Sequence, residues 1–179
     1  MAVSMDTTKV RVLGPAILLK EDSTKLGHTT DDGVEVTHAA TFQDVMVDVY
    51  GDTVINKYLI GESIQATATF AQFETEAISQ LIPFSTYSGS GSPPLQVGTD
   101  MGRSGLAQAF KLTIRPYQNH DESTPTETED ITIYKALPVD EIVIPVKFKE
   151  QAKLPVTFMG LPDFSNSVGN LLWGVGANA

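Results

Sequence analysis

The chain has 179 residues, no cysteine and a net charge of −10, from 22 acidic and 12 basic side chains. This length fits one domain, with room for long arms. The lack of cysteine excludes a disulfide scaffold and thiolate chemistry. The acidic balance excludes the basic surface with which nucleic-acid-binding proteins neutralise phosphates.

Two further classes are excluded by the pattern of apolar residues. No apolar run approaches the roughly 20 residues that a membrane helix needs. The start, MAVSMDTTKV, has no basic patch followed by an apolar stretch, so it does not resemble a secretory signal. We therefore expect synthesis in a cytoplasm.

Apolar residues alternate with a period of two along most of the chain, which predicts half-buried β-strands. The clearest stripe is Ile142, Ile144, Val146 and Phe148. Many short strands separated by Gly, Pro and Asp predict a mainly β fold, an antiparallel β-sandwich or near-closed β-barrel. In chain order, the predicted strands are 10–13, 17–19, 34–37, 45–49, 64–70, 111–115, 131–133, 142–148 and 154–158.

One segment, FETEAISQLIP, has the spacing of a helix instead. Ala77, Ile78, Leu81 and Ile82 recur on one helical face. Two glutamates lie in the expected first turn, where the helix dipole favours negative charge, and Pro83 marks the stop. We predict one short helix, about 74–82, flanking the sheet.

Three stretches lack periodicity: Pro83–Gly105, Gln118–Asp130 and Gly160–Ala179. The acidic second stretch is typical of disorder. The other two carry apolar side chains, which favours arms that become ordered on a partner. We predict a single domain, 1–179, with a long loop at 83–105 and a C-terminal arm at 160–179. The candidate contact residues on these arms are Phe84, Tyr87, Leu95, Leu171, Leu172 and Trp173.

No motif indicates a reaction. His28 lies near Asp31 and Asp32, but their spacing matches no metal-binding motif. The run YSGSGS lacks the ending of a phosphate-binding loop, and Gly102–Gly105 fails the G-x-S-x-G pattern. We therefore predict no enzyme, no catalytic residue, no metal and no cofactor.

A family resemblance rests on residues 42–82, which include DVYGDTVINKYLIGES. An acidic strand, Val47-Asp48 with Gly51, leads into a short strand, and a G-E turn, Gly61-Glu62, follows it. An alternating strand, Ile64 to Phe70, and the predicted helix follow. This order resembles the core of bacteriophage tail tube proteins, whose superfamily includes the tubes of injection systems. We expect tight turns at Gly51 and Gly61, because glycine permits the φ > 0 that such turns need.

The resemblance implies a β-sandwich or near-closed barrel that forms hexameric rings, in which neighbouring sheets join into an inner barrel. The rings stack into a tail tube, and the genome passes through its acidic lumen without specific binding. The implied lumen-lining candidates are Asp48, Glu62, Gln65, Thr67 and Thr69. The implied location is the virion tail, after synthesis in the bacterial host cytoplasm, with no membrane contact. The implied partners are other copies of the chain, a tape-measure protein, a tail terminator, baseplate or tail-tip proteins, and a sheath if the tail is contractile.

Other interpretations stay open at this point. The polar face of strand 64–70 would suit bulk solvent as well as a lumen. A tail terminator, neck ring or baseplate tube ring would share the same features. A carbohydrate-binding or adhesion β-sandwich is a further alternative, although aromatic residues form only 8% of the chain and most fall in apolar stripes or arms.

Overall fold

The computed structural model describes residues 16–21, 24–72, 75–91, 93–98, 101–116, 129–143 and 153–176. The predicted strand at 10–13 and most of the acidic stretch 118–130 lie outside these residues. So does the predicted strand at 142–148, apart from Ile142 and Val143, which lie in no strand.

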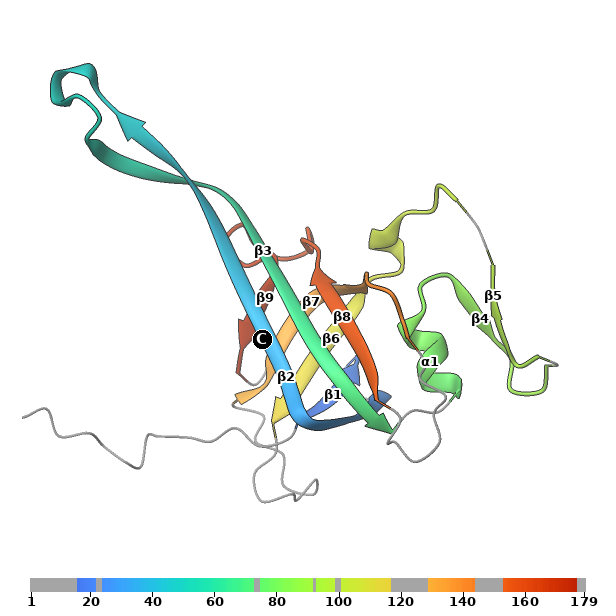
Figure 1. The fold of residues 1–179 in the computed structure, drawn as a ribbon. Helices are drawn as coiled ribbons and strands as arrows, with labels where there is room; N and C mark the ends of the chain where they lie inside the picture. The colour runs from blue at the N-terminus through green and yellow to red at the C-terminus, as the bar shows by residue number, and fades with distance from the viewer. Residues whose placement is uncertain are drawn as a thin grey trace, which may run out of the picture.

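The described chain is mainly antiparallel β-sheet with one short helix, which confirms the predicted fold class (Figure 1). Two strands, β2 and β3, are much longer than the rest. The elements in order are β1 (Ala16–Lys20), β2 (Thr24–Met46), β3 (Val54–Gln72), α1 (Thr75–Leu81), β4 (Ser85–Tyr87), β5 (Leu95–Val97), β6 (Phe110–Pro116), β7 (Ile131–Pro138), β8 (Leu154–Gly160) and β9 (Trp173–Val175).

Six strands close into a ring in the order β6-β1-β2-β3-β8-β7, because β6 also pairs with β7. One edge of β7 pairs with β6, and the opposite edge is shared by two strands. β9 pairs with Ile131–Ile133, and β8 pairs with Ala136–Pro138. β9 therefore continues the line of β8 along β7.

The apolar core fills the inside of this ring, and it is made of the alternate strand positions that the sequence predicts to be buried. On β3, Ile64, Ala66, Ala68 and Phe70 are buried, while Gln65 and Thr67 between them are exposed. Phe158 of β8 is fully buried and meets Phe110 edge-on, with ring centroids 6.3 Å apart. The strands predicted at 17–19, 34–37, 64–70, 111–115, 131–133 and 154–158 all lie within observed strands.

The helix α1 forms as predicted, and Leu81 is its buried residue. The prediction of an aperiodic loop at 83–105 was wrong in part, because β4 and β5 form a small hairpin there, with Tyr87 opposite Leu95. Three-residue strands are too short to give a periodic signal. Phe84, at the entry to this hairpin, adopts a positive φ of 61°.

The C-terminal arm is also partly ordered on its own chain. β9 joins the sheet beside β7, and Leu172 and Trp173 pack against the core. The prediction of an aperiodic arm over 160–179 is therefore corrected for residues 173–175. Their glycine-containing sequence, WGV, hid the strand.

Two local predictions near the family-like motif were wrong. Gly61 does not form a turn, because β3 runs without a break from Val54 to Gln72. Gly61 lies opposite Thr41, at a bulge where the register shifts before Phe42 pairs with Leu59. The stripe Val45, Val47 and Val49 is not one strand face, since β2 ends at Met46 and a 3-10 turn begins at Asp48.

Among the described residues, no helix has the length and apolar character needed to cross a membrane.

A projecting ribbon and the pocket at its base as the candidate functional site

The outer halves of β2 and β3 leave the ring together as a two-stranded ribbon (Figure 1). We define the ribbon as residues 39–63. β1 pairs with β2 only over Thr24–His28, and β8 pairs with β3 only over Gln65–Phe70. Within the described chain, the ribbon strands therefore pair only with each other, and both outer edges carry unpaired backbone groups.

The ribbon exposes large apolar side chains along its length. Val49 is 83% exposed, and Tyr58 and Ile60 are each 61% exposed. Tyr58 and Leu59 are neighbours in a regularly paired part of β3 and are both exposed, so the apolar side chains of the ribbon lie on both faces. A contiguous exposed apolar surface marks an interaction site. The exposed large apolar residues of the ribbon are Phe42, Met46, Val47, Val49, Val54, Ile55, Tyr58, Leu59 and Ile60.

Little within the ribbon stabilises it. Asp44 lies directly opposite Lys57, and their side chains form an ion pair at 2.9 Å. Both side chains are exposed, so this pair contributes at most about 1 kcal/mol. A two-stranded hairpin without a covered face is marginally stable in water. The ribbon therefore has the composition of a surface that becomes covered.

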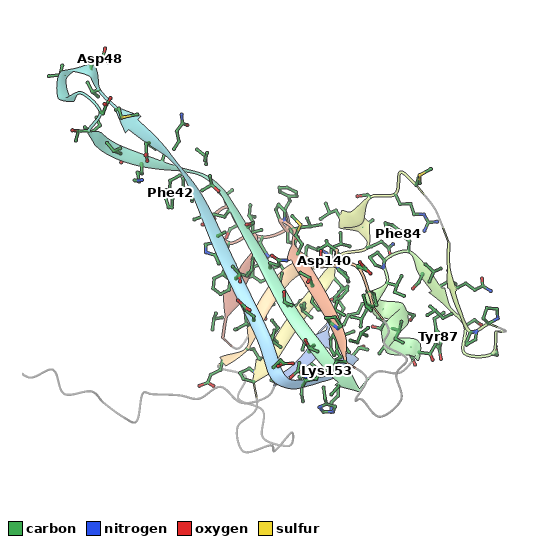
Figure 2. The ribbon with its side chains drawn as sticks, viewed as in Figure 1. Phe42, Asp48, Phe84, Tyr87, Asp140 and Lys153 are labelled. Atoms are coloured by element: carbon green, nitrogen blue, oxygen red, sulfur yellow. The ribbon has the colours of Figure 1, made fainter. Side chains whose placement is uncertain are left out.

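The tip of the ribbon is a 3-10 turn, Asp48–Tyr50, followed by Gly51. The Gly51 N–H donates to the carbonyl oxygen of Asp48 at 3.2 Å. Gly51 has a φ of 63°, in the left-handed region that glycine adopts without steric cost. Figure 2 shows Asp48 at this tip, far from the ring.

The structure separates the five lumen-lining candidates into three groups. Asp48 lies at the tip of the ribbon. Gln65, Thr67 and Thr69 lie together on the outer face of β3, with Gln65 and Thr67 exposed and Thr69 half-buried. Glu62 lies on the opposite face, because it shares the parity of buried Ile64. The structure therefore does not bring Glu62 and Asp48 together with the polar row.

Glu62 instead lines a pocket at the base of the ribbon, with a volume of about 330 Å³. His38 of β2 points to the same face, and its Nε2 lies 3.6 Å from Glu62 Oε1. The His38 and Trp173 rings are 5.8 Å apart and tilted by 44°. The segment before β9 supplies the rest of the lining, from Pro162 and from residues 169–172.

The six arm candidates are placed differently from one another. Phe84 is half-buried, with the Arg103 guanidinium 5.8 Å above its ring, and Tyr87 and Leu95 pair across β4 and β5. Figure 2 shows Phe84 and Tyr87 on the side of the molecule away from the ribbon. Leu171, Leu172 and Trp173 line the pocket. Leu172 and Trp173 thus contact their own chain, whatever else they contact in an assembly.

Two carboxylates of the described chain, Asp32 and Asp163, are held by specific neighbouring groups. The Lys153 ammonium donates a hydrogen bond to Asp32 at 3.0 Å and attracts it, and the Thr30 hydroxyl donates a second. These contacts lower the pKa of Asp32. Hydrogen bonds from the Ser165 hydroxyl and backbone lower the pKa of Asp163. In this part of the chain, no cluster of three or more His, Asp and Glu side chains could hold a metal ion.

Comparison with known proteins adds no relative. A scan against models of protein families matches none of them, and a search of curated proteins finds no match.

The expected short strand between Gly51 and Gly61 forms part of a much longer ribbon, whose length was not predicted, although the sequence carries a signal for it. In VINKYLI, apolar residues occupy both parities, so a strand there has no polar face. Such a strand is either buried on both faces or exposed for a partner. The pocket had no signal, because its lining comes from β2, β3, β9 and the segment before β9, and the first two are far in sequence from the last two.

Proposed function

We propose that the chain is a structural subunit of a bacteriophage tail tube, which builds rings that stack into a tube. The observation that carries this proposal is the ribbon, with its exposed apolar side chains on both faces and its two unpaired edges. Unpaired edges act as templates for strands of another chain unless they are covered. In a ring of subunits, neighbouring copies would cover both the edges and the apolar faces.

The charge of the chain supports the same function. A net charge of −10 repels a polyanion such as DNA, so a channel made of such subunits would let a genome pass without binding it. Gln65 and Thr67 offer a polar, uncharged row on the outer face of β3. This row would suit a wetted channel surface.

The first experiment is negative-stain electron microscopy of the purified chain at several concentrations, with and without tail tips as seeds. We expect rings or tubes with a central channel. Long tubes support a tube protein, whereas single rings that never stack indicate a terminator. A chain that stays monomeric even when seeded would contradict the proposal.

A shortened chain tests the role of the ribbon. Residues 43–58 are replaced by Asn-Gly, which joins the cross-strand partners Phe42 and Leu59 through a tight turn. Because the removed side chains lie outside the core, we expect a normal circular dichroism spectrum and cooperative melting, but no rings. Rings formed by this variant as readily as by the full chain would contradict the proposal.

Two sets of point variants test whether apolar side chains of the ribbon, rather than any side chain there, are needed for assembly. Tyr58→Ser with Ile60→Thr removes two exposed apolar side chains, and should raise the concentration needed for assembly at least tenfold. Gln43→Ser changes a polar side chain of the same ribbon, and should leave that concentration unchanged. Equal effects of the two variants would argue against apolar contacts by the ribbon.

A further inference from the structure

The pocket at the base of the ribbon has features of a binding site that are independent of the assembly proposed above. It brings together His38 of β2, Glu62 of β3 and Trp173 of β9. Its volume of about 330 Å³ lies at the small end of the range for ligand pockets. It is therefore suited to a side chain rather than a large cofactor.

The side of the pocket that carries Trp173 is held in place by hydrogen bonds. The Tyr134 hydroxyl donates to Asn170 Oδ1 at 3.0 Å, and the Tyr134 N–H donates to the Leu172 carbonyl at 3.1 Å. The Asp163 N–H donates to the Leu171 carbonyl at 2.8 Å. Binding would then cost little ordering of the pocket itself.

Glu62 supplies the one carboxylate among the lining residues of this pocket. The distance of 3.6 Å to His38 Nε2 is too long for a hydrogen bond, and the Glu62 side chain is 44% exposed. No lysine or arginine is among the lining residues. The carboxylate therefore faces the pocket with acceptor capacity that a cationic donor would use.

The aromatic rings add a second attraction for a cation. The indole of Trp173 and the imidazole of His38 form a tilted pair beside Glu62. A guanidinium is planar, stacks on aromatic faces and matches a carboxylate with its fork of N–H groups. An apolar side chain would leave the carboxylate desolvated without a partner, and an anion would be repelled by it. A net charge of −10 favours a cation over a neutral ligand.

From these contacts we infer that the pocket binds the guanidinium group of an arginine side chain presented by a protein partner. The guanidinium would lie against Trp173 and donate hydrogen bonds to Glu62. The partner is another protein with a basic surface, because a chain with a net charge of −10 and three arginines favours a basic partner over a second acidic copy. A second copy is the alternative that the assembly assays below separate from it.

The test uses the fluorescence of Trp173, which is the only tryptophan of the chain. The full chain is titrated with N-acetyl-arginine amide and with N-acetyl-citrulline amide, a neutral analogue of the same shape. We expect a saturable change in emission with a millimolar dissociation constant for arginine, and binding at least tenfold weaker for citrulline. Equal responses to both compounds, or no saturable response to arginine, would overturn the inference.

Two variants locate the binding. Glu62→Gln keeps the size of the side chain but removes its charge, and should weaken arginine binding at least tenfold. Glu35→Gln is the matched control, because Glu35 is exposed on the opposite face of the same sheet. It should leave binding unchanged. If Glu62→Gln binds arginine as tightly as the natural chain, the pocket is not the site. On addition of arginine, the NMR resonance of the Trp173 indole N–H should shift in the natural chain and in Glu35→Gln. It should not shift in Glu62→Gln.

Assembly assays of the same variant distinguish the two sources of arginine. The chain has three arginines, of which Arg115 pairs with Asp130 at 2.6 Å and Arg103 lies over the Phe84 ring. If a second copy supplies the side chain, Glu62→Gln impairs ring formation, and so does Arg11→Gln or Arg103→Gln. If another protein supplies it, all three variants assemble normally while Glu62→Gln still loses arginine binding. The loss of arginine binding in Glu62→Gln can be measured whether or not the chain forms a tail tube, so the binding inference can fail or hold separately from the proposed function.

Discussion

At the scale of single residues, Gly160 shows how closely the ring is packed. It is buried at the end of β8, opposite Ala136. A Cβ atom there would overlap the Ile64 Cγ2 methyl group and would lie 3.1 Å from Ile133 Cγ2. Only a residue without a side chain fits between these two isoleucines.

We expect Gly160→Ala to lower the free energy of unfolding by about 1–3 kcal/mol, the usual cost of overpacking a core. Urea denaturation followed by circular dichroism measures this. Gly61→Ala is the control, since nothing lies within 4 Å of the added Cβ. It should be neutral or stabilise slightly. A Gly160→Ala variant as stable as the natural chain would show that the ring adjusts its packing easily.

The Asp32–Lys153 pair gives a prediction about pH. The pKa of Asp32 is lowered mainly by the hydrogen bond and the charge of Lys153. A lowered folded-state pKa stabilises the protein above the ordinary value of 3.8, and this contribution is lost as the pH falls through the folded-state pKa. Because both side chains are exposed, the contribution to stability is small.

The pKa itself is the sharper measurement. In Lys153→Gln, NMR titration of the carboxyl carbons should show the pKa of Asp32 raised toward its ordinary value. The pKa of Asp163 should stay low in the same variant, because Ser165 supplies its hydrogen bonds. An Asp32 pKa that is unchanged by Lys153→Gln would show that Thr30 alone holds it.

At the scale of elements, the Arg115–Asp130 pair connects β6 with the start of β7. Arg115 Nε lies 3.0 Å from both carboxylate oxygens, and a terminal nitrogen lies 2.6 Å from Oδ2. The carbonyl oxygen of Asp130 accepts a hydrogen bond from the Gly176 N–H just after β9. One residue thus links three strands at the seam where the ring closes.

We expect Asp130→Ala to destabilise the fold by about 3–5 kcal/mol, because it leaves a largely buried guanidinium without its carboxylate. The double variant Arg115→Met with Asp130→Leu should recover much of that loss. Asp44→Ala, which breaks an exposed pair in the ribbon, should cost less than about 1 kcal/mol. Thermal or urea unfolding of the three variants checks this order. Equal costs for Asp130→Ala and Asp44→Ala would contradict it.

Comparison of the elements shows what the sequence can predict. Strands such as 64–70 and 154–158 were predictable, because one face is buried and the alternation is regular. The extent of β2 and β3 was not, because the ribbon has no buried face to impose a period. β4, β5 and β9 are too short to show one. Of the candidate site, Gln65 and Thr67 lie on one strand face as predicted, whereas Glu62 lies on the other face, because it is two positions from buried Ile64.

At the scale of the whole molecule, charge and apolar surface act in opposite directions. The charge of −10 repels other copies, whereas in the proposed assembly the exposed apolar side chains of the ribbon would attract them. Salt screens the repulsion and leaves apolar contact intact, since the Debye length falls from about 30 Å at 0.01 M to about 3 Å at 1 M salt. The balance between these effects should therefore depend on ionic strength.

We predict that assembly, followed by light scattering, increases as sodium chloride is raised over this range. The chain with the shortened ribbon should stay monomeric at every salt concentration. This control would show that the scattering does not come from precipitation of the rest of the protein by salt. Assembly that weakens with added salt would mean that opposite charges, rather than apolar side chains, hold the copies together.

The topology also suggests an order of events during folding. The β2–β3 hairpin pairs residues that are close in sequence, beginning at the Gly51 turn, whereas β1 with β6 and β3 with β8 join residues about ninety positions apart. Local pairing is fast, and closing long loops is slow. The hairpin should therefore form before the ring closes. A nascent chain would then expose the apolar ribbon before its core is complete, and the repulsion between acidic chains would oppose premature association of that ribbon with other copies.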